Sequence, residues 1–299
     1  RALDATEAAL TNFGQWYGPY PYPRLTVVDV PDDGQGAGGM EYPMLITAGP
    51  MSALGISLDV ARGADRSLEL VVVHEAAHQW WQSVVATNEA EEPWLDEGMT
   101  EYSAVRLLTR LYGPDRSLLD SRLVSMGNID SRRLEYFLSP NVPMYGPAWE
   151  FDTVQYVVGA YSKPALALLT LERTLGEETM LEVMSTYYQR YRFGHPTTED
   201  FRAVAQEVTG QELSWFFDGL VYGDEAGKAF DGLWKKHIGF FVDYTKAVGA
   251  GDKAAAQKAA DDLTRYATDF AAFLSSANPN LPKDAVADLV KTHILTLKT

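Results

Sequence analysis

The sequence predicts an α+β fold, in which a small mixed sheet precedes a helical body and a small all-α unit follows. Three observations predict it. Extended segments separated by turns occur between residues 25 and 47, helical periodicity dominates from about residue 68 to residue 209, and Ala, Lys and Asp become frequent after Gly223. We therefore expect one domain over residues 1–223 and a helical bundle or hairpin, truncated at its end, over residues 228–299.

The first 47 residues should form one helix and two strands. Leu3–Tyr17 has helical spacing and runs into Gly18–Pro23, where three prolines forbid further helix. Leu25–Val30 and Met40–Thr47 are predicted to be short strands. Because Pro43 has no N–H to donate, the second strand should lie at an edge or carry a bulge.

The remainder of the first domain should be helical. A buried helix is expected over Leu68–Val85, with Ser67 as its N-cap, and a second helix should run from Trp94 to Leu111. Later helix boundaries are marked by Pro164 near a start, Gly176 after an end and a capping box at Thr197–Asp200.

Composition excludes several classes of protein and site. The chain has 299 residues, no cysteine and a formal charge of −16. Without cysteine there is no disulfide, no thiolate nucleophile and no thiolate metal site, so any metal must rest on His and carboxylates. The acidic charge and the lack of a Lys/Arg stripe argue against nucleic acid as a partner, and no apolar run is long enough to span a bilayer.

A five-residue motif on the predicted buried helix points to a metal. Residues 74–78 read HEAAH. A spacing of four places His74 and His78 one turn apart on one face, where two imidazoles can bind one zinc ion, while Glu75 projects beside them toward a water. A motif this short also occurs by chance, so it needs a third donor.

Glu97 supplies that donor. Residues 79–96, eighteen in number, separate it from the second histidine. Catalytic zinc usually has three protein ligands and one open position, so His74, His78 and Glu97 would complete a site for one ion. The alternative is an ordinary glutamate in the first turn of a helix, which the helix dipole favours. Glu101, four residues further on, could accept the second N–H of a ligand histidine or could be a solvated glutamate.

These motifs, together with an upstream segment GGMEY at residues 38–42, resemble the gluzincin metallopeptidases of the aminopeptidase N type, which include the leukotriene hydrolase. Thermolysin-like enzymes share the zinc motif but lack the G-x-M-E strand. The resemblance covers about residues 2–223. It implies a thermolysin-like catalytic domain, zinc as the cofactor and removal of N-terminal residues from peptides.

The resemblance also implies roles for individual residues. The strand Gly38-Gly39-Met40 would let a peptide backbone approach, and Glu41 would bind its free amine. Glu75 would be the general base and Tyr161 the hydrogen-bond donor to the oxyanion, in a segment YSKP where the family commonly reads YEKG. Tyr156 stands where some members carry a second tyrosine. Tyr42 replaces the asparagine or similar residue that usually follows this glutamate.

Two other functions remain open. The chain could be a catalytically weak binding or scaffold module, in which the C-terminal helices dock a protein partner, although every chemically required group is present. It could also be an endopeptidase, which would cleave peptides with blocked N-termini. The lack of cysteine and the acidic charge are compatible with an extracellular or cell-surface bacterial enzyme.

Overall fold

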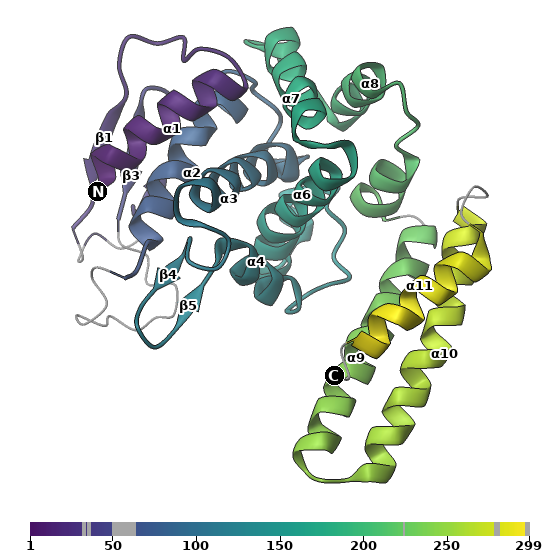
Figure 1. Cartoon of the computed structure of the whole chain (residues 1–299). Coiled ribbons are helices and arrows are strands. Elements are labelled where there is room, and N and C mark those ends of the chain that lie inside the picture. The colour runs from purple at the N-terminus through teal and green to yellow at the C-terminus, as the bar shows by residue number, and fades with distance from the viewer. Residues whose placement is uncertain (32–33, 35–36, 50–63, 224, 278–281, 297–299) are drawn as a thin grey trace. The chain divides into compact units, whose positions relative to one another are not determined.

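The computed structural model describes residues 1–31, 34, 37–49, 64–223, 225–277 and 282–296. These residues form two compact units, Arg1–Tyr222 and Gly223–Thr299 (Figure 1). The first unit combines helices with a small sheet, so the predicted α+β class is confirmed for it.

A three-stranded sheet follows the first helix, α1 (Ala2–Trp16). Its order is β1 (Thr26–Asp29), β3 (Leu45–Ala48), β2 (Gly39–Met40), with β1 parallel and β2 antiparallel to β3. The sheet is therefore mixed, as predicted.

The prediction of one continuous strand over Met40–Thr47, at an edge or with a bulge, was wrong in its extent. The segment splits into the edge strand β2 and the central strand β3, because a turn with Met44 at a φ of 63° separates them. Pro43, which cannot donate a backbone hydrogen bond, lies in this turn rather than in either strand.

Two adjacent helices form the centre of the first unit. In Figure 1, α2 (Ser67–Trp81) and α3 (Met99–Tyr112) lie side by side, and α1 packs against α2. The predicted N-cap was wrong, because Arg66 is the N-cap and Ser67 is the first helical residue; the N–H of Ser67 donates to Asp65 Oδ1 at 2.7 Å. A carboxylate two residues earlier thus caps the helix from outside.

The helix predicted from Trp94 to Leu111 begins differently. Trp94–Gly98 forms a π-helical turn, η2, and only then does α3 begin. A second π-turn, η4 (Val157–Ser162), precedes α6 (Lys163–Leu175), and the two π-turns pack against each other. π-turns are rare and occur often at functional sites.

Other elements complete the first unit. They are the hairpin of β4 (Leu119–Asp120) and β5 (Ser125–Met126), α4 (Asn128–Tyr136), η3 (Ala148–Glu150), α5 (Thr153–Tyr156), α7 (Glu177–Tyr191), α8 (Thr198–Thr209) and η5 (Trp215–Val221). The predicted helix boundaries are confirmed. Pro164 lies in the first turn of α6, Gly176 follows its end, and Thr197 and Asp200 form a capping box for α8.

The core of the first unit is rich in aromatic side chains, which surround α2 and α3. The largest that are fully buried there are Trp80, Trp81, Trp94, Tyr17, Tyr102, Tyr187, Tyr188, Phe13, Phe201, Phe216 and Phe217. Close packing of this kind fixes the helices that carry the site, because few side-chain rotamers fit such a core.

The second unit consists of three helices among its described residues: α9 (Glu225–Gly249), α10 (Lys253–Ala277) and α11 (Lys283–Thr296). Its apolar contacts gather around Leu263 and Ala267 of α10, on which Phe240, Phe241 and Val290 pack. Its helical character agrees with the sequence, whereas its role as a separate domain stays a prediction.

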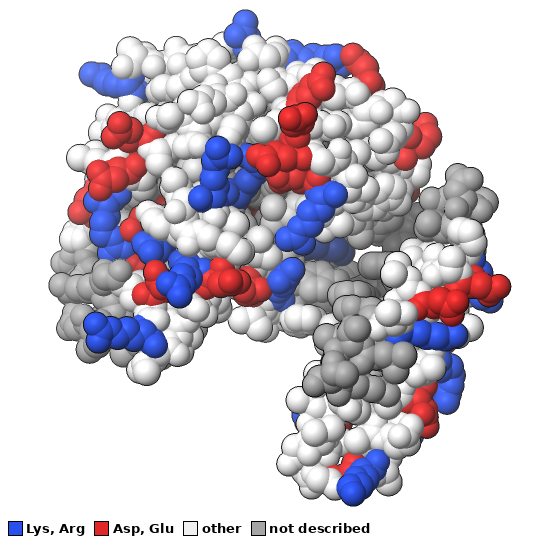
Figure 2. Space-filling model, in the orientation of Figure 1, with Lys and Arg blue, Asp and Glu red and all other residues white. Residues whose placement is uncertain are grey.

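Charge is distributed without segregation on the face drawn in Figure 2, where acidic and basic side chains of the first unit lie interspersed. Among the described residues, no helix combines the length and apolar character needed to cross a bilayer. Nucleic acid as an excluded partner stays a prediction from composition.

Candidate metal centre

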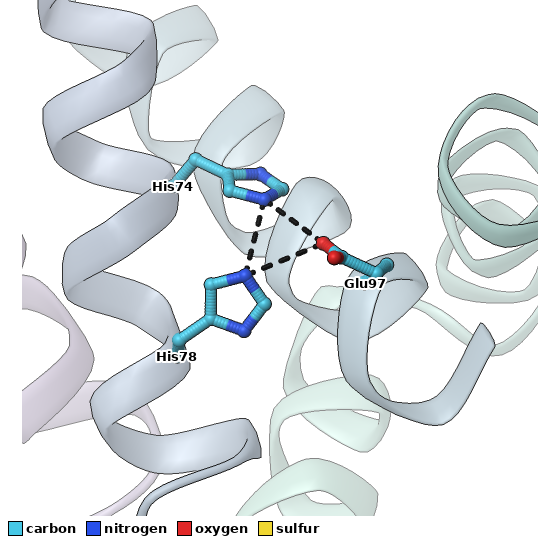
Figure 3. A group of neighbouring side chains, drawn as sticks. All are labelled: His74, His78 and Glu97. Carbon is cyan, nitrogen blue, oxygen red and sulfur yellow. Dashed lines mark hydrogen bonds and ion pairs between the residues drawn. The ribbon is translucent and has the colours of Figure 1, made fainter. Parts of the chain in front are cut away.

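Two histidines of α2 point to the same place. His74 and His78 are one turn apart, and both are buried, with 9% and 1% of their surface exposed. Their Nε2 atoms lie 3.2 Å apart, with the ring planes nearly perpendicular at 80° (Figure 3). The i, i+4 spacing on one helix face produces this convergence.

Glu97 reaches the histidines from the π-turn η2 on the neighbouring segment (Figure 3). Its Oε2 atom lies 3.1 Å from Nε2 of His74 and 3.3 Å from Nε2 of His78. Close packing of the next residue holds the turn in place, because a Cβ on Gly98 would lie only 2.4 Å from Cβ of Pro164. Gly98 therefore allows η2 to approach α6.

The outer nitrogen of each histidine contacts a buried acid. His74 Nδ1 lies 2.8 Å from Glu101 Oε2, and His78 Nδ1 lies 2.6 Å from Asp96 Oδ1 and 3.2 Å from Thr100 Oγ1. Carboxylates accept hydrogen bonds, so this arrangement favours the tautomer with the proton on Nδ1. Asp96 was not predicted from the sequence, although its position directly before the third donor was a usable signal.

The donor set fits a zinc ion. With both Nδ1 atoms donating, each Nε2 carries a lone pair that faces the other Nε2 and a carboxylate oxygen of Glu97, so three acceptors face one another. Their separations of 3.1 to 3.3 Å are close to the edge of ~3.3 Å expected for a tetrahedron of donors about 2.0 Å from zinc. A cation between them would satisfy all three.

Glu75 lies beside this group. It is 7% exposed, and its Oε2 is buried and unpaired among the described residues. Its Oε1 lies against the edge strand, because a Cβ on Gly39 would come within 2.7 Å of it. Burial raises the pKa of this carboxyl above its usual value, and the nearby histidines oppose that shift.

Tyr161 of η4 also contacts this group. Its hydroxyl donates to Oε1 of Glu97 at 2.5 Å, and its ring stacks on His74 with centroids 5.7 Å apart. Burial and the carboxylate of Glu97 raise the pKa of this phenol well above its usual value, so the hydroxyl stays protonated and can donate. Tyr156 packs edge-on against Tyr161 at 5.8 Å.

Glu41 lies beyond the end of β2, among other acids. One carboxylate oxygen from each of Glu41, Glu89 and Asp96 lies within 4.8 Å of the others. The two preceding residues, Gly39 and Met40, form β2, and the O atom of Gly38 accepts from the N–H of Gly49. Glu89 was not predicted, because nothing in its local sequence distinguishes it from other surface acids.

Comparison with sequence families gives a match over most of the chain. Residues 1–220 match the model for the peptidase family M1 domain. Aminopeptidase 2 of Candida albicans is 27% identical over 248 residues, which are 80% of this chain and 24% of that protein. Aminopeptidase M1-B of Oryza sativa subsp. japonica is 27% identical over 252 residues, 83% of this chain and 26% of that protein. The chain spans about a quarter of the length of these relatives.

Solved structures are similar in fold. An M1 zinc metallopeptidase from Deinococcus radiodurans superposes with a TM-score of 0.52 at 19% identity, covering 73% of this chain and 43% of that one. Legionella pneumophila aminopeptidase A, in complex with aspartic acid, superposes with a TM-score of 0.57 at 20% identity, covering 74% and 24%. At these identities the similarity shows the fold.

Proposed function

The chain belongs to peptidase family M1, and from this premise we propose that it hydrolyses peptide bonds with zinc and removes N-terminal residues from peptides. The family predicted from the sequence motifs is thereby confirmed. The observation that carries the proposal is the convergence of Nε2 of His74, Nε2 of His78 and Oε2 of Glu97, with an acid on each outer nitrogen. Such a set holds a cation and leaves a position for substrate.

Each side chain around the set has a defined task in hydrolysis. His74, His78 and Glu97 would hold a zinc ion, which would supply Lewis-acid chemistry to the carbonyl and to the attacking water. Glu75, buried and unpaired, can take a proton from that water and pass it to the leaving amine. The raised pKa of its carboxyl suits it to both steps, because it brings acid and base forms closer in free energy at neutral pH.

Tyr161 and Glu41 would act on the substrate itself. The Tyr161 hydroxyl, whose raised pKa keeps its proton, can donate to the oxyanion that forms at the carbonyl carbon. In the structure that hydroxyl donates its hydrogen bond to Glu97, so it would have to exchange this acceptor for the oxyanion when substrate binds. Glu41, near Glu89 and Asp96, gives negative charge that attracts the ammonium group of a free N-terminus. This charge favours an aminopeptidase over an endopeptidase.

A paired substrate panel tests the proposal. Zinc-loaded protein, Glu75→Gln and Glu41→Gln are each given aminoacyl fluorogenic amides and the N-acetylated forms of the same compounds. We expect cleavage of the free-amine forms, a loss of at least about 1,000-fold in Glu75→Gln with zinc retained, and a raised KM in Glu41→Gln.

Other outcomes would point elsewhere. Equal cleavage of acetylated and free amides would contradict the proposed aminopeptidase activity and favour an endopeptidase. Zinc bound by the unmodified protein without cleavage of either form would favour the scaffold function, in which the helices of the second unit dock a partner. An extracellular or cell-surface location stays a prediction.

A further inference from the structure

Helix α4 brings an ion pair to the back of the metal centre. Arg132 Nη1 lies 3.5 Å from Glu101 Oε1, and Arg132 Nη2 lies 2.8 Å from Glu135 Oε1. The Glu101 side chain is 4% exposed and the Arg132 side chain 13% exposed. Since Glu101 Oε2 already contacts His74 Nδ1, this guanidinium is the only positive group that the structure reports within ion-pair distance of Glu101 besides that histidine, among the described residues.

Glu135 then links this pair to the π-turn η4. Its Oε2 accepts a hydrogen bond of 2.5 Å from the hydroxyl of Ser162, which is fully buried and is the last residue of η4. Tyr161 precedes it in the same turn and donates to Glu97 Oε1. These contacts, closed by the backbone between Ser162 and Tyr161, form a circuit that contains two of the three candidate metal ligands, in the order His74, Glu101, Arg132, Glu135, Ser162, Tyr161 and Glu97.

We propose that Arg132 and Glu135 are positioning residues that tie the metal ligand His74 to the tyrosine that contacts the reacting carbonyl. The proposal rests on the function proposed above only for the role of Tyr161. The guanidinium of Arg132 lies between the carboxylates of Glu101 and Glu135 and attracts both, and without it the buried Glu101 would keep only its contact with His74 among the described residues. Neither Arg132 nor Glu135 contacts the three donor atoms directly.

The circuit has two arms with different consequences. The Arg132 arm orients Glu101, which orients His74, so its loss should weaken metal binding. The Ser162 arm fixes the turn that carries Tyr161, so its loss should lower kcat while KM and metal affinity change little. A residue that merely stabilised the fold would move neither quantity selectively.

Zinc affinity tests the first arm without any need for peptidase activity. Competition with a chromophoric chelator should show zinc binding to Arg132→Gln weakened about 10-fold to 100-fold, with part of the loss restored in Arg132→Lys. Arg202→Gln is the matched control, since Arg202 is a partly buried arginine paired with Asp218 away from the circuit. A zinc affinity of Arg132→Gln within twofold of that of the unmodified protein would overturn the proposed role of Arg132.

A double-mutant cycle tests the second arm. Ser162→Ala should lower kcat about 10-fold in the unmodified protein and have almost no effect in a Tyr161→Phe background, because the hydroxyl that it positions is then absent. Ser162→Thr, which keeps a hydroxyl, should restore part of the kcat. Ser103→Ala, at another fully buried serine with hydrogen bonds, controls for loss of stability. Equal losses in both backgrounds would overturn the arm.

The cycle has a second readout, which separates failure of this inference from failure of the proposed function. Because Tyr161 donates to the ligand Glu97, Ser162→Ala should shift the visible spectrum of the cobalt-substituted protein, and should not shift it in the Tyr161→Phe background. If no peptide is cleaved by the unmodified protein, the peptidase proposal fails, while the zinc affinities and cobalt spectra still decide this one. Unchanged spectra in both backgrounds would overturn it.

Discussion

The two units of the chain are built on opposite principles. Residues 1–222 enclose ionisable side chains between helices, and several of these acids and imidazoles are almost fully buried: His74, Glu75, His78, Asp96 and Glu101. In the second unit, the buried side chains among the described residues are mostly alanines around Leu263, and ion pairs such as that of Lys258 with Asp262 lie at the surface.

This difference in buried ionisable groups indicates that the reactive side chains belong to the first unit. Burying a charged group costs several kcal/mol unless partners compensate it, so the first unit must hold its acids and imidazoles in fixed geometry. Surface ion pairs such as those of the second unit contribute little, and the donor set consists of residues of the first. We therefore expect changes in the first unit to affect activity and changes in the second to affect only its own stability.

Removing the metal should produce the largest difference between the two units, in activity and in thermal stability. Chelation should abolish measurable peptidase activity, since the three converging donors then have no cation between them. It should also lower the unfolding midpoint of the first unit, because a ligand at 1,000 times its Kd adds about 4 kcal/mol to the folded state. Calorimetry of zinc-loaded and chelated protein checks both units in one scan. An equal shift in the unfolding midpoint of the unit formed by α9–α11 would contradict the expected difference between the units.

Removing the hydroxyl of Tyr161 tests its assigned role at the oxyanion within the first unit. Tyr161→Phe should lower kcat about 100-fold, which corresponds to about 2.7 kcal/mol, while zinc content stays at that of the unmodified protein. Stopped-flow or steady-state turnover with metal analysis measures both. A kcat within threefold of the unmodified value would show that this tyrosine does not meet the oxyanion.

One methyl group on the edge strand should have a smaller effect. In Gly39→Ala the new Cβ would lie 2.7 Å from Glu75 Oε1 and would push the carboxylate aside, so kcat/KM should fall about 10-fold with little loss of stability. Gly14→Ala in α1 is the control, because its new Cβ would meet nothing within 4 Å and the residue lies outside the site. Equal activity of the two variants would contradict this placement of Glu75.

A change in the second unit should leave activity unaltered. Leu263→Ala removes the largest fully buried aliphatic side chain of α10 and should destabilise that unit by about 2 to 3 kcal/mol. Leu289→Ala, at a residue that is 72% exposed, should have almost no effect on stability. Calorimetry measures the stability, and the amide assay measures activity. Loss of turnover in Leu263→Ala would show that the units are coupled.

Sequence was most informative where signals are local and periodic. The spacing of His74 and His78 places them together on any helix, and the capping box at Thr197–Asp200 depends on contacts within four residues. The turn at Met44 and the cap by Asp65 escaped prediction, since neither follows from the apolar pattern.

Part of the candidate site escaped prediction for a different reason. Arg132 reaches Glu101 across 31 positions, and Ser162 reaches Glu135 across 27, with no fixed spacing to search for. Glu89 brings a carboxylate oxygen within 4.8 Å of one from Glu41 although 48 positions separate them. Contacts of this kind depend on how helices pack, which one sequence alone does not specify.

The π-turn at Trp94–Gly98 makes the site sensitive to chain length. A π-turn holds one residue more than an α-turn, so deleting one residue there would let an ordinary α-helix form. The residues on one side of the deletion would then rotate by about 100° about the helix axis relative to those on the other side. Point substitutions would leave this frame intact, whereas with the fully buried Trp94 held in the core a single-codon deletion at Leu95 would turn Glu97 away from His74 and His78.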